Sequence, residues 1–193
     1  SMYTRGAFFK CSNLNNVTFE EGTAEIASML FAACDGLTEI TIPDTVTVIE
    51  SQAFELCSNL EKVIIPDSVT EIDGWAFNSC TSLENIIIPD SVTFIGNYSF
   101  EDCTSLKSIV IPDSVTRIGA SAFSNCTSLA SVTLSKSLES MGTQAFAYCT
   151  ALTSIEIPKS LDEVTRDGSM YTRGAFFKCS NLNNVTFEEG TAE

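Results

Sequence analysis

Eight cysteines are the side chains best suited to chemistry in this chain of 193 residues. All follow a Phe-x-x-Cys step and share one position of an internal repeat: Cys11, Cys34, Cys57, Cys80, Cys103, Cys126, Cys149 and Cys179. A catalytic thiol needs a base and zinc sites usually combine Cys with His, but the chain contains no His and no Cys-x-x-Cys pair. We therefore predict a structural column of eight buried thiols, because stacked Cβ vectors run parallel and free Cys packs as a small hydrophobe. Pairwise disulfides and metal binding remain the alternatives.

Four aspartates form a second chemically capable set at one repeat position: Asp44, Asp67, Asp90 and Asp113. Stacked repeats would place these carboxylates about 5 Å apart. Such a row could recruit a hard cation such as Ca²⁺, which takes oxygen ligands. We favour the alternative, in which each Asp bonds to the backbone of its own turn.

The remaining residues offer no support for an enzyme or a cofactor. Without His, neither a Ser-His-Asp nor a Cys-His site can form. The chain contains neither a Walker A lysine loop nor a Gly-x-Gly-x-x-Gly motif. The adjacent acids Glu101 and Asp102 are better explained as a solvated face of an acidic protein. We expect no catalytic activity, no cofactor and no metal.

Composition restricts the partners. The net charge is −15, so nucleic acids and anionic membranes would be repelled. The charge either keeps a long exposed surface soluble or meets a basic protein partner. Hydrophobic residues make up 44% of the chain, but no apolar run is long enough to insert into a membrane.

An internal repeat of fixed length positions these residues. The segment Ala76–Tyr98 matches again from Ser99 and from Ala122, which defines a 23-residue period. The first seven Phe-x-x-Cys steps follow this period, and the eighth comes after a longer interval, from Phe146 to Phe176. Such a period predicts one solenoid over residues 1–193, with about eight repeats, a truncated last repeat and a seven-residue insertion at about 164–174.

Each repeat contains the pattern of a short strand. Leu83-x-x-Ile86-x-Ile88 alternates with period two, and Pro89 ends the run. A second extended piece is predicted at Val92-x-x-Ile95, and a helical turn at the Phe-x-x-Cys step. The predicted inward positions are Phe77, Cys80, Leu83, Ile86, Ile88, Val92 and Ile95.

The pattern AFxxCxxLxxIxIPxSVxxIGxx resembles the BspA-like, or Treponema pallidum type, leucine-rich repeat. The resemblance implies an α/β repeat solenoid: a right-handed superhelix with a parallel β-sheet on the concave face and short helical turns or irregular segments outside. Members of this family are commonly surface proteins of bacteria or protozoa, and some adhere to host matrix proteins. The resemblance thus implies a non-catalytic protein-binding or adhesion module, at the cell surface or secreted.

An exposed apolar stripe is the candidate binding surface. The residue between the two inward strand positions is apolar in three successive repeats, at Ile64, Ile87 and Val110. The flanking polar positions are Glu61, Lys62, Glu84, Asn85 and Lys107. An apolar stripe with a charged rim is typical of a protein-binding surface. Alternatively, β-branched residues at these positions only favour the strand.

Residues 1–25 return unchanged as residues 169–193. Since other repeats match one another only in part, this identity indicates a joining seam, an engineered duplication or a recent natural one. Neither terminal repeat offers a polar cap, which predicts end-to-end self-association. The rival function is therefore an engineered or self-associating structural repeat scaffold without a natural ligand.

Overall fold

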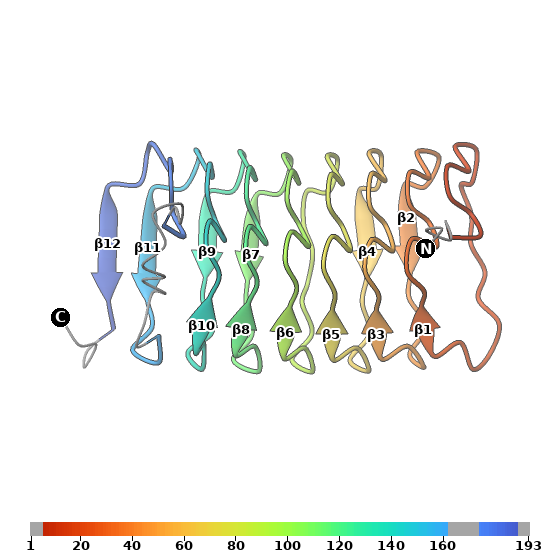
Figure 1. Cartoon of the computed structure of the whole chain (residues 1–193), viewed down its shortest axis with the longest axis horizontal. Helices are drawn as coiled ribbons and strands as arrows, with labels where there is room; N and C mark the ends of the chain where they lie inside the picture. Colours follow the sequence, from red (N-terminus) through yellow and green to blue (C-terminus); the bar gives the residue numbers. More distant parts are fainter. Residues whose placement is uncertain (1–5, 162–173, 189–193) are drawn as a thin grey trace, which may run out of the picture.

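The chain forms one extended stack of coils built from parallel strands (Figure 1). The computed structural model describes residues 6–161 and 174–188. Each coil runs up through one short extended piece, over a turn and down through another (Figure 1). The predicted solenoid with parallel strands is confirmed.

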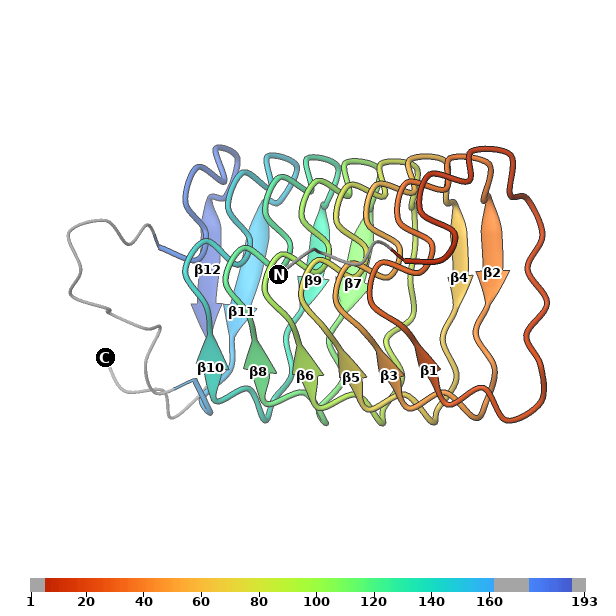
Figure 2. The same ribbon diagram turned by 45° about the vertical axis from the view of Figure 1, so that its right-hand side comes forward.

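Two rows of strands run along the stack on different sides (Figure 2). The first row is a continuous six-stranded sheet of two-residue strands: β1 (Glu25–Ile26), β3 (Val48–Ile49), β5 (Glu71–Ile72), β6 (Phe94–Ile95), β8 (Arg117–Ile118) and β10 (Ser140–Met141). The second row consists of three separate pairs: β2 (Glu39–Thr41) with β4 (Lys62–Ile64), β7 (Ser108–Val110) with β9 (Ser131–Thr133), and β11 (Ser154–Ile157) with β12 (Asn184–Phe187).

Strand register follows the sequence period. Glu25 pairs with Val48, Val48 with Glu71, and Glu71 with Phe94, so each step along the sheet is one repeat. Between β11 and β12 the step is longer, since Ser154 pairs with Asn184. The seven extra residues of that repeat therefore do not break the pairing of the two strands. The predicted insertion site at about 164–174 lies almost entirely outside the described residues.

Two details of the predicted coil are wrong. The described residues contain no helix, and the Phe-x-x-Cys step forms irregular turns instead of a helical turn. The continuous sheet is built from the second extended piece, whereas the segment Ile86–Ile88 forms no strand. The helical turn does not form because a step of three or four residues, closed by left-handed residues, cannot start the hydrogen-bond ladder of a helix.

The core is a set of identical columns along the stack. All seven predicted inward residues of the coil from Ala76 are buried, which confirms the inward face. Ring centroids of neighbouring phenylalanines are 5.0 to 5.6 Å apart in the column Phe8, Phe31, Phe54, Phe77, Phe100, Phe123, Phe146 and Phe176. Each ring is covered by the rings of its neighbours, so a single coil could not bury its apolar face alone.

Left-handed backbone at non-glycine residues closes the turns of every coil. One such residue precedes each Cys of the column, including Leu56 (φ 62°) and Ser79 (φ 59°). A second lies two residues before most of the column phenylalanines, as at Gln52 and Trp75. None of the fourteen described non-glycine residues with positive φ is Val, Ile or Thr. β-Branched side chains fit this conformation worst, so the turn restricts residue type at positions that the hydrophobic pattern leaves open.

Leu56 offers a test of this constraint because its side chain is 47% exposed and contributes little burial. We expect Leu56→Asn to raise the free energy of unfolding by about 0.5–1 kcal/mol, since Asn tolerates the left-handed region, and Leu56→Val to lower it by about 1 kcal/mol or more. Chemical denaturation of both variants beside the parent chain measures the two changes. Equal stability of the Asn and Val variants would contradict the assignment.

Candidate functional site

The outward positions of the second strand row form the exposed stripe. In β4, Lys62 and Ile64 point outward while Val63 is buried, and β7 repeats this pattern with Ser108, Ile109 and Val110. The three apolar side chains differ in exposure: Ile64 is 45% exposed, Ile87 82% and Val110 62%. Ile87, in the middle of the stripe, is thus the most exposed of the three.

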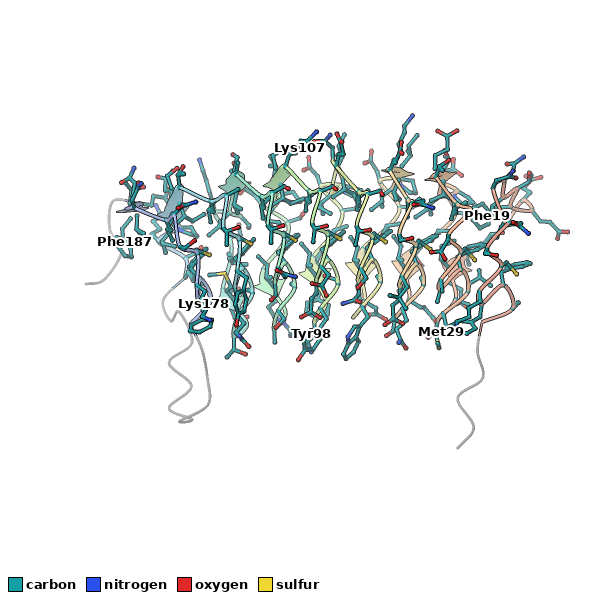
Figure 3. All side chains as sticks on the ribbon, turned by 90° about the horizontal axis from the view of Figure 1, so that it is seen from above. Phe19, Met29, Tyr98, Lys107, Lys178 and Phe187 are labelled. Carbon is teal, nitrogen blue, oxygen red and sulfur yellow. The ribbon has the colours of Figure 1, made fainter. Side chains whose placement is uncertain are left out.

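Charged and polar side chains border the stripe. Glu61, Lys62, Glu84, Asn85 and Lys107 are all exposed. The Lys107 ammonium forms an ion pair with the Glu84 carboxylate one coil earlier. Because both partners are more than half exposed, this pair adds little stability. It brings two opposite charges together at the border of the stripe, and Lys107 lies on the side of the molecule opposite Tyr98 (Figure 3).

Strand pairing is interrupted where the stripe is most exposed. No strand forms at Ile86–Ile88, between β4 and β7. Grooves lie on both sides of this segment: one of about 530 Å³ between Glu61 and Lys62 on one coil and Glu84 and Asn85 on the next, and one of about 430 Å³ bordered by Ile87 and Val110. The stripe therefore combines raised apolar side chains with shallow flanking grooves.

The cysteine column makes a regular series of hydrogen bonds between coils. Seven thiols donate to the carbonyl of the column Phe one coil earlier, with Sγ–O distances of 3.0 to 3.3 Å, as from Cys80 to Phe54. That carbonyl also accepts the backbone N–H of its own coil's Cys, at 3.2 Å from Cys57 to Phe54. All eight cysteines are free thiols, so the disulfide alternative is not found.

One member of the column departs from the prediction of eight buried thiols. Cys11 is exposed, whereas the other seven are buried. Within the described residues, no coil precedes the one that holds Cys11, so neither a covering ring nor a Phe carbonyl is supplied to its thiol. Burial in this column depends on the neighbouring coil and not on the sequence of the coil itself.

The four aspartates of the repeat position are all exposed. No group of three or more His, Cys, Asp or Glu side chains in the described ranges is placed to hold an ion. Asp113 accepts a hydrogen bond from the Lys136 backbone N–H at 2.8 Å, which belongs to the next coil and not to its own turn. The serine that follows the aspartate makes a hydrogen bond between coils: the hydroxyls of Ser68 and Ser91 each donate to a Val carbonyl of the preceding coil.

Sequence reasoning missed one aromatic pair on another face. The rings of Trp75 and Tyr98 stack with centroids 4.8 Å apart, and both residues have left-handed backbone. They occupy the same position of successive repeats, so alignment of the repeats could have predicted that the two rings stack. Facing each other, the rings hold two adjacent turns together.

The comparisons with known proteins agree with this architecture. The family model described as BspA type leucine rich repeat region matches residues 4–107 and 93–193. The chain therefore belongs to the BspA-type leucine-rich-repeat family. No curated protein matches the chain.

Solved structures of bacterial leucine-rich-repeat proteins are similar to this chain. A protein from Bacteroides ovatus is 38% identical, with a TM-score of 0.77 over 85% of this chain and 41% of its own. The Treponema pallidum leucine-rich-repeat protein is 28% identical, with a TM-score of 0.56 over 67% of this chain and 71% of its own. A protein from Eubacterium ventriosum is 28% identical, with a TM-score of 0.59 over 81% of this chain and 52% of its own. The chain spans less than half of the Bacteroides ovatus protein.

The buried thiols predict a loss of stability at high pH. Burial raises the pKa of the Cys57 thiol from 9.0 to about 12, and burial likewise raises the pKa of Cys80, Cys103 and Cys126. The unfolded chain releases these protons first, so the stabilisation is complete below about pH 9 and is lost as the pH rises toward the folded-state pKa. Each thiol should contribute a loss of about 1.4 kcal/mol per pH unit in that window.

Denaturant unfolding at a series of pH values measures the slope. Tyr and Lys also titrate in this range, so Cys57→Ala serves as the comparison: it should be less stable at neutral pH and lose stability less steeply above about pH 9. An identical slope in the two proteins would contradict the role of this thiol.

Proposed function

We propose that the chain is a non-catalytic protein-binding module whose contact surface is centred on Ile87. The observation that carries the proposal is the 82% exposure of this isoleucine, between Ile64 and Val110 on successive coils. Large apolar side chains are normally buried, and three in a row on a rigid surface favour a partner that covers them.

The surroundings of the stripe suit a protein ligand. Glu84 and Lys107 form a charged border beside the apolar centre, and the flanking grooves can accept protruding side chains. Apolar centres with polar rims are the usual arrangement in protein interfaces, where a few central residues supply most of the affinity. The net charge of −15 favours a partner with a basic surface around its contact patch.

Family membership supports a proposal for the location and the class of partner. We place the module at the cell surface or outside the cell, with an adhesion role toward a host matrix or cell-surface protein, on family membership. In the described part of the chain, no helix is long and apolar enough to span a membrane. The right-handed superhelix with a concave sheet also remains a prediction from the family.

Ile87→Asp tests the stripe. It should weaken binding about 30-fold or more, because a central apolar contact contributes about 2 kcal/mol and a buried charge would oppose it. The melting temperature should stay unchanged, since the side chain is exposed. The measurement is surface-immobilised binding to matrix and cell-surface proteins, first to find a ligand with the parent chain and then to compare variants.

Leu56→Asp is the matched control, because Leu56 is an exposed apolar residue outside the stripe whose backbone conformation accepts Asp. Binding should survive this change. Equal loss in both variants, or none in Ile87→Asp, would refute the stripe as the contact surface.

A second candidate function is a self-associating scaffold without a natural ligand. The 25-residue identity of the two terminal segments favours it. A measurement of assembly distinguishes the two functions. The scaffold requires that the purified chain assembles by itself, whereas the binding module requires a different protein.

A further inference from the structure

The two copies of the 25-residue segment fold alike at their Phe-x-x-Cys turns. In the first copy (residues 1–25) the Cys11 N–H donates to the Phe8 carbonyl at 3.0 Å, and in the second copy (residues 169–193) the Cys179 N–H donates to Phe176 at 3.2 Å. Lys10 and Lys178 share the left-handed conformation, with φ of 61° and 56°. The same sequence thus makes the same half-coil at both ends of the stack.

The copies use opposite faces of that half-coil. Phe8 of the first copy stacks on Phe31 of the following coil, with centroids 5.6 Å apart. Phe176 of the second copy stacks on Phe146 of the preceding coil, also at 5.6 Å. Each copy therefore leaves uncovered, in the described residues, the face that the other copy buries. Figure 3 shows Phe19 and Phe187, which are equivalent residues, at the two ends of the stack.

The first copy is attached less completely than the second. Residues Asn184–Phe187 of the second copy form β12 and pair with β11 along the whole strand. The identical Asn16–Phe19 forms no strand, although the repeat period would set it beside β2. A groove of about 580 Å³ is bordered by Asn15–Val17, by β2 and by Lys62 and Ile64 of β4. Figure 1 shows the first copy as the red trace beyond β2. In the described chain β2 thus has a strand partner on its β4 side alone.

We propose that the second copy of one chain replaces the first copy of another and pairs with its β2, which joins chains head to tail. The incoming segment carries the sequence that already packs on Phe31, so the contacts of residues 6–19 have equivalents in residues 174–187. Val185 and Phe187, now exposed, would take the half-buried positions of Val17 and Phe19. The exchange gives the self-association considered above a specific form and does not depend on a ligand at Ile87.

The energetic balance permits this exchange. Identical sequences make identical contacts, so displacement of the first copy is nearly neutral in contact energy, as in other domain swaps. The gain is strand pairing along β2 and burial of the uncovered face of the second copy. The opposing term is the entropy lost on association, which makes assembly depend on protein concentration.

One pair of equivalent glycines reports directly on the exchange. A Cβ at Gly6 would lie 2.0 Å from the Met29 carbonyl oxygen and 2.6 Å from the Leu30 Cα, because the following coil packs on it. A Cβ at Gly174 would meet nothing within 4 Å. If the second copy occupies the position of the first on another chain, its Gly174 must meet that chain's Met29 in the same way.

The experiment measures mass by light scattering over a wide range of concentration, after incubation under mildly destabilising conditions that release the first copy. The parent chain should form head-to-tail oligomers that grow with concentration. Gly174→Ala should raise the apparent dissociation constant about tenfold or more while leaving the melting temperature unchanged. Gly6→Ala should promote assembly, because it loosens the first copy. Ile87→Asp should assemble like the parent.

Phe187→Ser and Phe19→Ser provide a second pair if a glycine variant fails to fold, with the same expected directions: less assembly for the first and more for the second. A parent chain that is monomeric throughout overturns the proposal. Assembly of Gly174→Ala at the parent's level also overturns it, because the chains would then associate without packing Gly174 against Met29. Loss of assembly in both members of a pair overturns exchange in favour of direct stacking of the two ends.

Discussion

The hydrogen bond from each buried thiol to the Phe carbonyl of the preceding coil, together with the stacked rings above it, sets the geometry of this protein. The Phe54 carbonyl accepts from Cys57 in its own coil and from Cys80 in the next. One oxygen thereby fixes both the turn within a coil and the spacing between coils. The thiol meets that oxygen at every 23-residue step, so the fixed period and the hydrogen bond support each other. The one longer step, from Phe146 to Phe176, keeps the same contact, from Cys179 to Phe146.

This dependence on neighbours divides the molecule into a rigid middle and less supported ends. Interior coils are covered on both faces, so their opening costs the contacts of two interfaces. Within the described ranges the coil of Phe8 is covered on one face, and its thiol at Cys11 is exposed. The stripe at Ile87 belongs to the middle, where a fixed row of side chains can meet a partner with little loss of conformational entropy. The duplicated segments belong to the ends, where exchange costs least.

The sequence predicts the repeat unit well, because period and residue type both follow from burial. Phe77, Cys80 and Leu83 are inward since only apolar side chains recur at those positions, and the structure buries all three. The turns could not be predicted in the same way: Leu56 adopts left-handed backbone although nothing in its side chain requires it. A tertiary hydrogen bond imposes that conformation, from the Leu56 N–H to the Asn78 carbonyl of the next coil at 2.8 Å. The exposed position of Ile87 was predictable from period two, whereas the missing strand and the grooves beside it do not follow from the sequence pattern, since Ile86–Ile88 is as β-branched as the segments that do form strands.

Native-state alkylation of the cysteines, read by mass spectrometry, tests the central claim most directly. If burial comes from the neighbouring coil, Cys11 should react at the rate of a free thiol. Cys57, Cys80, Cys103 and Cys126 should react only as the stack unfolds, with one shared denaturant dependence. Labelling of these four at the rate of Cys11, or at four unrelated rates in native buffer, would contradict a stack whose coils cover one another.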